Sequence, residues 1–415
     1  MTNAALALAV TQALNRVMAQ DRGRLLSALT VRLRDFELAE EVLQDAAMSA
    51  LDHWGRAGVP QSPTGWLLKV AYRKAIDRFR HAARQGQYAE EIARLAEDEA
   101  ALADAPDIAD DRLRLIFTCC HPALEPKTRV ALTLRTLCGL STAEVAAVFL
   151  DTEVAMGQRL SRAKAKIARA KIPYRIPEPE DFADRINSVL TVIYLVFTSG
   201  YAAGAGPGLT ERGRPPARDL CLEAIYLARL VNDLRPGEPE VEGCLALLLL
   251  THARAGARAT RDGTTVPLSE QDRGLWDASL LQEGQAVLLR ALARKQSGPF
   301  QIKAAIAACQ MEAPPDWPQI AALYGALMPF EDTPVTRLNR AVAIFELGQH
   351  KVALAQVEGL ADDLAGYQPF HAVHADFLAR LGRFSESRAA YGRAIHFATN
   401  PADVSFLLKR QAKLP

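Results

Sequence analysis

The sequence predicts an all-α protein, and three observations lead to this prediction. Apolar residues recur at steps of three and four, as in 38–51 and 132–149, which is the period of an amphipathic helix. No run alternates apolar and polar side chains with the β-branched enrichment typical of strands. Helix-start signals are also present, because Ser141 is followed three residues later by Glu144, the spacing of a capping box.

The composition is that of a globular protein with more than one domain. The chain has 415 residues, of which 49% are hydrophobic and 23% charged, so disordered and fibrous classes are excluded. Six cysteines without a CxxC pair, and a start without a basic n-region, predict a reduced cytoplasmic protein. The most apolar stretches, 190–197 and 245–250, are much shorter than a membrane span, so we expect no membrane anchor.

Charge divides the chain into blocks. The formal net charge is +4 for 1–85, −8 for 86–111, +8 for 112–175 and −3 for 176–415. This pattern predicts two polyanion-binding modules, an acidic linker and a separate C-terminal domain, with a boundary at the proline-rich segment 172–179. The alternative interpretation is uneven charge on solvated faces, which charge alone does not exclude.

The segment 137–171 predicts a helix-turn-helix. One helix should run from Thr142 to about residue 149, and a second, capped by Asp151 or Thr152, from about residue 153 to 170. On the second helix, Met156, Leu160, Ala163 and Ile167 form an apolar stripe opposite a basic surface. An ordinary solvated basic helix is the competing interpretation. The candidates for DNA contact are Gln158, Arg159, Arg162, Lys164 and Lys166.

A second basic helix is expected around residues 63–84, where cations alternate with aromatic residues. Such a surface suits unpaired DNA, because cations meet phosphates while rings stack on bases. Phe79 is expected in the core instead. The candidate contacts are Trp66, Lys69, Arg73, Lys74, Arg78 and Arg80. The preceding segment FELAEEVLQDAAMSALDHW should place an apolar stripe inward and Glu40, Glu41 and Asp45 outward.

Read together, LAEEVLQDAAMSAL, WLLKVAYRKAIDRFR and LTLRTLCGLSTAEVAAVFLDTEVAMGQRLSRAKAKI resemble domains two and four of extracytoplasmic-function sigma factors of the sigma-70 family. The resemblance implies sigma domain 2 at 1–85, sigma domain 4 at 112–175, and binding to promoter DNA and to the two largest subunits of core RNA polymerase. By this resemblance the helix from Lys69 to Arg84, with the loop from Gly55 to Gly65, would open and hold the minus-10 element, and Arg159 and Arg162 would read the minus-35 element. The implied polymerase-docking residues are Leu38, Glu41, Val42, Gln44 and Asp45.

The C-terminal region 176–415 should be helical and partly repetitive. Gly348 and Gly382 align between RAVAIFELGQHKVALAQVEGL and HADFLARLGRFSESRAAYGRAI at the tetratricopeptide period, so we expect tetratricopeptide-like repeats at about 334–400. Together with YLVFTSGYAAG and DGTTVPLSEQDRGLWD, this tail is similar to that of extracytoplasmic-function sigma factors with a long regulatory extension. The resemblance implies that the tail governs sigma activity, with a protein or an intramolecular partner.

A polar cluster in the tail has two interpretations of equal weight, a contact surface and a capped loop that enters a helix. Its residues, the regulatory candidates of the tail, are Asp262, Gln271, Asp272, Arg273, Trp276 and Asp277, with Glu270 beside them. The glycine-rich segment 200–208 lacks a phosphate-binding signature and is interpreted as a hinge.

The sequence predicts neither a catalytic set nor a cofactor or metal site. Cys119, Cys120 and His121, with Cys138 beyond, lack the paired spacing of zinc ligands and are expected as buried helix residues. The leading hypothesis is therefore a sigma factor that is not an enzyme. Two alternatives stay open. One is a helix-turn-helix regulator with a tetratricopeptide sensor that does not bind core polymerase, and the other is a tail (176–415) that binds a small molecule or has an enzyme activity, with the front half as a DNA tether. A convergent polar pocket near 262–277 would favour the last.

Overall fold

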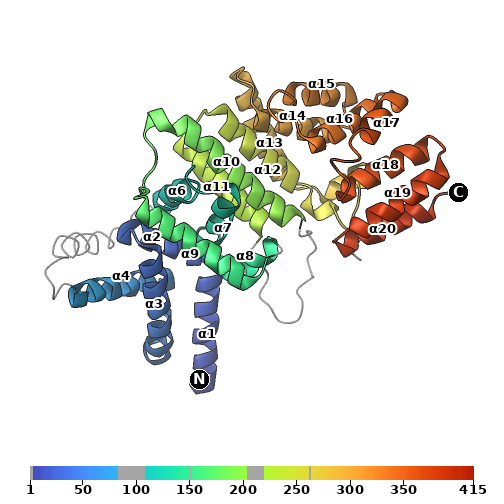
Figure 1. Ribbon diagram of the computed structural model, residues 1–415. Coiled ribbons are helices and arrows are strands. Elements are labelled where there is room, and N and C mark those ends of the chain that lie inside the picture. Colours follow the sequence, from blue (N-terminus) through green and yellow to red (C-terminus); the bar gives the residue numbers. More distant parts are fainter. Residues whose placement is uncertain (1–2, 83–107, 150, 203–218, 261–262) are drawn as a thin grey trace. The chain divides into compact units, whose positions relative to one another are not determined.

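The computed structural model describes residues 3–82, 108–149, 151–202, 219–260 and 263–415 (Figure 1). In these residues the regular structure is helical, apart from an isolated bridge between Ala259 and Thr265. The predicted all-α fold is confirmed. The chain divides into two compact units, Met1–Val196 and Phe197–Pro415. Asp262, the glycine-rich segment from residue 203 on, and most of the acidic linker lie outside the described residues.

Four helices open the first unit: α1 (Asn3–Gln20), α2 (Arg22–Leu33), α3 (Phe36–Ala57) and α4 (Pro63–Ala82). The side chain of Asp35 starts α3 by accepting hydrogen bonds from the amides of Glu37 and Leu38, which satisfies two of the free donors at a helix start. The helices share one apolar core, in which Trp54 and Tyr72 are fully buried. This packing fixes the faces that α3 and α4 turn outward.

The rest of the first unit carries the predicted helix-turn-helix. Its helices are α6 (Ile108–Cys119), α7 (Pro126–Thr136), α8 (Thr142–Val148), α9 (Glu153–Arg169) and the start of α10 (Pro179–Ala202). Arg185 of α10 donates to the carbonyl of Phe117, and the Ser188 hydroxyl donates to that of Cys120. These bonds satisfy carbonyls at the C-terminal end of α6.

The second unit contains α11 (Leu220–Leu234), α12 (Pro239–His252), α13 (Ala278–Ala293), α14 (Pro299–Gln310) and α15 (Trp317–Leu327). Every residue from Val241 to Leu250 is buried, because α12 packs against α11, α13 and α14. At Gly243 a side chain would meet the backbone of Gln301 at 2.6 Å, so glycine permits the close approach of α12 and α14.

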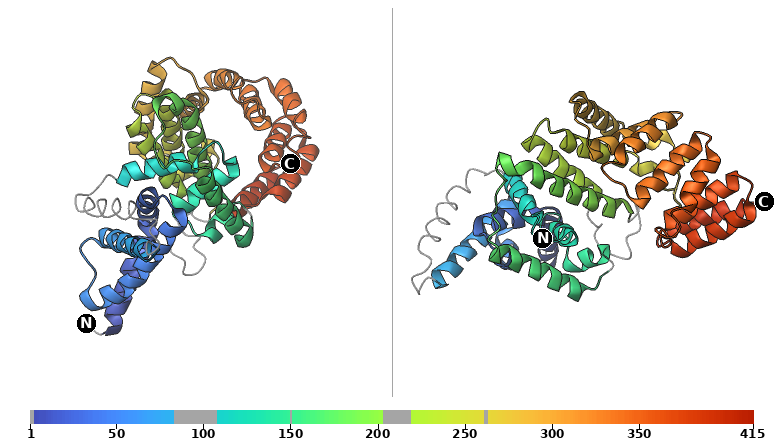
Figure 2. Two further views of the ribbon diagram at one scale, coloured as in Figure 1. Left: turned by 60° about the vertical axis from the view of Figure 1, so that its left-hand side comes forward. Right: turned by 45° about the horizontal axis from the view of Figure 1, so that its top comes forward.

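The predicted repeats are two successive helix pairs. They are α16 (Pro334–Glu346) with α17 (His350–Glu358), and α18 (Gln368–Arg380) with α19 (Phe384–Phe397), followed by α20 (Pro401–Ala412). These helices stack side by side at the red end of the chain (Figure 2). Gly348 and Gly382 end the first helix of each pair with φ of +82° and +78°, a conformation that other residues adopt at a cost. The equivalent residues Ala341 and Ala375 are both fully buried.

Candidate nucleic-acid and partner interface

The turn before α9 is fixed by side-chain caps. The Ser141 hydroxyl accepts from the amide of Glu144 at 3.2 Å, and the Glu144 carboxylate accepts from the amide of Ser141 at 2.7 Å. At the start of α9, the Thr152 hydroxyl accepts from the amide of Ala155 at 3.2 Å. The predicted capping box and both helix starts are confirmed, and they position the first turn of α9.

Helix α9 has one buried face and one exposed cationic face. Met156, Leu160, Ala163 and Ile167 are buried, as predicted. Gln158, Arg162, Lys166 and Arg169 are exposed, and so is Val154, whose side chain is 72% exposed in the first turn. Sequence reasoning missed Val154, although an exposed apolar residue at the start of such a helix can contact a thymine methyl group.

The predicted DNA-contact residues of α9 differ in the hydrogen bonds and ion pairs that they form within the protein. Arg162 is exposed, and its Nε donates to the carbonyl of Gln158 at 3.3 Å. Arg159 is half-buried and forms an ion pair with Asp151 at 3.2 Å. The Lys166 ammonium donates to the carbonyl of Ala123. Of these side chains, Gln158 and Arg162 reach outward with the fewest bonds to break.

Lys164 lies instead in a cluster around the carboxylate of Glu40 in α3. Glu40 pairs with Lys164 of α9 at 2.6 Å, with Arg135 of α7 at 2.6 Å and with Arg22 of α2 at 3.3 Å. Burial alone would raise the pKa of Glu40, but the surrounding cations, foremost Arg135 and Lys164, hold it below its usual value. While the pair persists, Lys164 is not available to a DNA phosphate.

The expectation that Glu40 faces solvent is therefore wrong. Its carboxylate is 17% exposed, because α7 and α9 cover the surface of α3 on which it lies. This cluster, which we call the Glu40 cluster (Glu40, Arg22, Arg135 and Lys164), joins the α1–α4 half of the first unit to its helix-turn-helix half.

Helix α4 presents cations on its exposed side and aromatic rings on its packed side. Lys69, Arg73 and Arg80 are exposed, and Lys74 is half-buried. Trp66 is half-buried, with its ring centroid 5.4 Å from that of His53 and 5.5 Å from that of Trp54. Phe79 packs against the core, as predicted. The Arg78 guanidinium is bonded to Glu41 and, at 2.9 Å, to Asp45 of α3.

The outward face of α3 differs in part from the predicted docking residues. The prediction that Val42 is a surface contact is wrong, because Val42 is fully buried in the core. Glu41 and Gln44 are exposed, and Leu38 and Asp45 are half-buried. Sequence reasoning missed Met48, which is 66% exposed and follows Glu41 and Gln44 at helical spacing. An exposed methionine beside polar groups is a favourable surface for a protein partner.

Comparison with known proteins identifies the family to which the two halves of the first unit belong. Residues 18–85 match the model of sigma-70 region 2, and residues 114–167 match that of sigma-70, region 4. The chain belongs to the sigma-70 family. Residues 185–292 match a family of unknown function, DUF6596. The chain is also 42% identical over 395 residues to an uncharacterized protein of Rhizobium meliloti (strain 1021), covering 93% of this chain and 92% of that protein. No solved structure matches.

Membership of the sigma-70 family gives the two halves of the first unit their roles in outline. The region 2 match covers α2–α4 and the end of α1, and the region 4 match includes the helix-turn-helix. Sigma-70 proteins are transcription initiation factors that bind core RNA polymerase and promoter DNA, and they are not enzymes. None of the helices in the described residues combines the length and apolar character that crossing a membrane requires.

The polar cluster in the tail of this sigma-70 protein consists of residues that cap helices or hydrogen-bond to backbone carbonyls. Asp277 caps α13 by accepting from the amides of Ser279 and Leu280. Asp272 accepts from the amide of Gly274, and Arg273 donates to the carbonyl of Met311 at 2.8 Å. These bonds agree with the interpretation as a capped loop. The side chain of Gln271 donates to the carbonyl of Val266, and Trp276 lies under the Arg273 guanidinium.

The cysteines of region 4 are packing residues. Cys119, Cys120 and Cys138 are buried, as expected. Burial raises the pKa of the Cys120 thiol to about 12, although a hydrogen bond with the Thr133 hydroxyl opposes this shift. Within the described residues no cluster of His, Cys, Asp and Glu could hold a metal ion.

Proposed function

We propose that this protein is a sigma factor of the extracytoplasmic-function class, which acts in the cytoplasm and directs core RNA polymerase to a subset of promoters. The observation that carries the proposal is the geometry of α9, whose capped first turn exposes Val154, Gln158 and Arg162 above a buried stripe. A helix of this kind fits the major groove, where glutamine and arginine hydrogen-bond to base edges. It would read the minus-35 element.

Region 2 would supply the other two contacts. The exposed cations Lys69, Arg73 and Arg80 suit phosphates of the minus-10 element, with Trp66 beside them as a stacking ring. Glu41, Gln44 and Met48 on α3 would dock on the polymerase. Because Arg78 is bonded to Glu41 and Asp45, we assign it to positioning α3 against α4 rather than to DNA.

We further propose that the second unit modulates sigma activity. The support is its size and its separate core, together with the resemblance of its repeats to tetratricopeptide units, whose stacked helix pairs commonly bind peptides or other domains.

Reconstituted transcription with purified core polymerase tests the first proposal. Full-length protein should bind core polymerase and start transcription at promoters selected from genomic DNA. If it bound the DNA but not the core enzyme, the helix-turn-helix regulator without polymerase binding would take the place of the sigma factor.

A further inference from the structure

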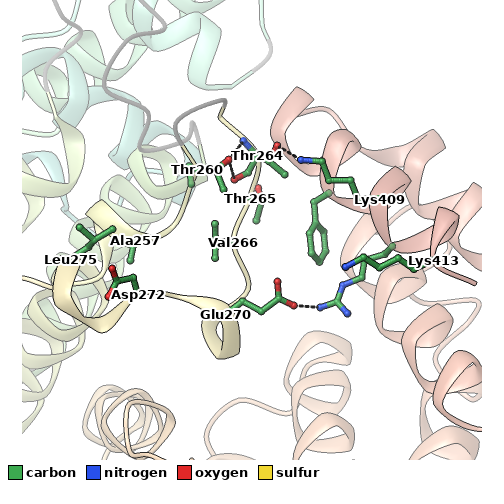
Figure 3. A pocket seen from close by; sticks show the side chains of 13 residues that line it. Ala257, Thr260, Thr264, Thr265, Val266, Glu270, Asp272, Leu275, Lys409 and Lys413 are labelled. Carbon is green, nitrogen blue, oxygen red and sulfur yellow. Dashed lines mark hydrogen bonds and ion pairs between the residues drawn. The ribbon is translucent and has the colours of Figure 1, made fainter.

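A cavity of about 410 Å³ lies in the second unit, between residues of 257–260 and 264–275 on one side and α20 on the other (Figure 3). Its volume falls in the range of small-molecule sites, roughly 300–1,000 Å³. It includes threonine hydroxyls, carboxylates, cations and apolar side chains, and it lies where the sequence places the polar cluster of the tail. Its position agrees with the place, near 262–277, at which a pocket would favour a ligand-binding tail.

Three hydrogen bonds hold the two walls together across 138 to 145 residues of sequence. The Thr265 hydroxyl donates to Asp403 at 2.7 Å, and Lys409 donates to the Thr264 hydroxyl at 3.1 Å. Arg410 pairs with Glu270 at 2.7 Å. Because these bonds close the rim without a ligand, the cavity is formed in advance, which lowers the cost of binding.

The wall formed by α20 is cationic. Lys409 and Arg410 each lie three or four positions from Phe406 and from Lys413, so the four side chains share one face of the helix. Lys409 and Arg410 are bonded to the opposite wall, as the dashed lines in Figure 3 show. Among the described residues, the ammonium of Lys413 has no hydrogen bond or ion pair. It is the cation that can meet an incoming charge.

The opposite wall is partly apolar and partly acidic. Ala257, Val266 and Leu275 line it, and Leu275 is 57% exposed. The carboxylate of Glu270 is neutralised by Arg410, whereas Asp272 accepts a bond from the amide of Gly274. The negative charge of Asp272 directs an anion away from this wall and toward α20, while the apolar residues favour an uncharged body.

We propose that this cavity binds a small molecule that carries one compact anionic group, carboxylate or phosphate, on an apolar body. The anionic group pairs with Lys413, and the body packs against Leu275 and Phe406. The ligand would lie against both the segment that matches the family of unknown function and the last helix after the repeats. This inference goes beyond the sigma function and does not depend on it.

Isothermal titration of the full-length protein tests the proposal with four probes: phenylacetate, phenyl phosphate, phenylacetamide and inorganic phosphate. We expect saturable binding of phenylacetate or phenyl phosphate, and the stronger of the two identifies the anionic group. Phenylacetamide, which lacks the charge, and inorganic phosphate, which lacks the apolar body, should bind at least about ten-fold more weakly.

Lys413→Ala should weaken binding of the anionic probe by about ten-fold or more, because it removes a charge-assisted bond. Lys413→Arg should retain binding, and Leu275→Ala should weaken it by a few fold through lost apolar contact. Lys351→Ala, which removes an exposed lysine of α17, is the matched control. Circular dichroism checks that each variant keeps its helices.

Three outcomes would overturn the proposal. The first is equal binding of phenylacetate and phenylacetamide. The second is an equal affinity for the anionic probe in Lys413→Ala and Lys351→Ala, which would show attraction to basic surface in general. The third is no saturable binding of either anionic probe up to millimolar concentration.

Discussion

Two arginines of α9 three positions apart show how local contacts decide which side chain can read a base. The Arg159 guanidinium is held by Asp151 and lies 5.8 Å from the centroid of the Phe149 ring, so it must leave an ion pair before it contacts DNA. Arg162 is exposed. Since a guanidinium reads guanine through two N–H groups at once, Arg162 is the stronger candidate of the pair.

Replacing both arginines should therefore separate promoter recognition from polymerase binding. The double variant Arg159→Ala/Arg162→Ala should lose about 1–3 kcal/mol of base discrimination per bidentate contact, a drop of roughly ten-fold or more in promoter-specific transcription. Run-off transcription measures the loss, and a pull-down with core polymerase should be unchanged. Arg175→Ala, an exposed arginine outside α9, serves as control. Loss of core binding in the double variant would contradict this division of roles.

Individual side chains also show where sequence reasoning succeeds and where it stops. The buried stripe of α9 follows from helical period alone, so Met156 and Leu160 could be predicted. Glu40 could not, because Lys164, which covers it, is 124 residues away in sequence. Period identifies the faces of a helix but not which other element packs on each. Val42 is a different case, because the family resemblance placed it at the docking surface although its position in the apolar stripe of 38–51 predicts the observed burial.

At the scale of the element, the Glu40 cluster should make the first unit sensitive to acid. The folded pKa of Glu40 is lower than its usual value of 4.5, so its stabilising effect is complete above that pH and is lost as the pH falls through the lower folded value. Glu40→Gln should cost about 2 kcal/mol near neutral pH, and the difference from the unmodified protein should shrink below pH 4.5.

Urea unfolding of both proteins across this pH range measures the effect. Glu37→Gln, on the exposed side of α3, should change stability by less than about 1 kcal/mol and show no comparable dependence on pH. A constant difference between Glu40→Gln and the unmodified protein down to pH 3 would show that the carboxylate charge is not what stabilises the cluster.

The turns of the two repeats predict a matched pair of effects. Gly348→Ala and Gly382→Ala should each destabilise the second unit by about 1–2 kcal/mol, because both glycines have positive φ and a side chain at either would meet open space. Gly325→Ala is the control with the opposite sign, since Gly325 lies inside α15 with equal room, and alanine there should stabilise by about 0.5–1 kcal/mol. Thermal unfolding distinguishes the signs.

At the scale of the whole molecule, removing the tail tests regulation. Ending the chain at Lys171 would delete Arg185 and Ser188, which are bonded to α6, so a chain that ends at Ala202 keeps the first unit intact. If the tail modulates sigma activity, this shortened chain and the full chain should differ several-fold in promoter-dependent initiation, and the faster one gives the sign of regulation. A further variant that ends at Leu327 assigns the effect to the repeats. Equal rates for all three would contradict a regulatory tail.

Fold class was predictable at this scale because the helical period is visible in the sequence. The spacing of Gly348 and Gly382 likewise indicated the two helix pairs from α16 to α19, whose tetratricopeptide character stays a prediction. The limits of the compact units were not, since they meet between Val196 and Phe197 inside the continuous helix α10, where neither proline nor glycine punctuates the chain. The boundary at 175 and the other predicted domain limits stay predictions. The cavity beside α20 required residues 138 to 145 positions apart to meet, and no local pattern contains that information.

The uninterrupted burial of α12 has a consequence for synthesis of the protein. A ribosome releases Val241–Leu250 as a stretch in which Glu242 is the one charged residue, whereas α14, which covers one side of it, follows about 60 residues later. At roughly 5–20 residues per second, this stretch is exposed for several seconds. Nascent chains of this protein should therefore be clients of chaperones that hold apolar segments, and overproduction in cells that lack them should give inclusion bodies.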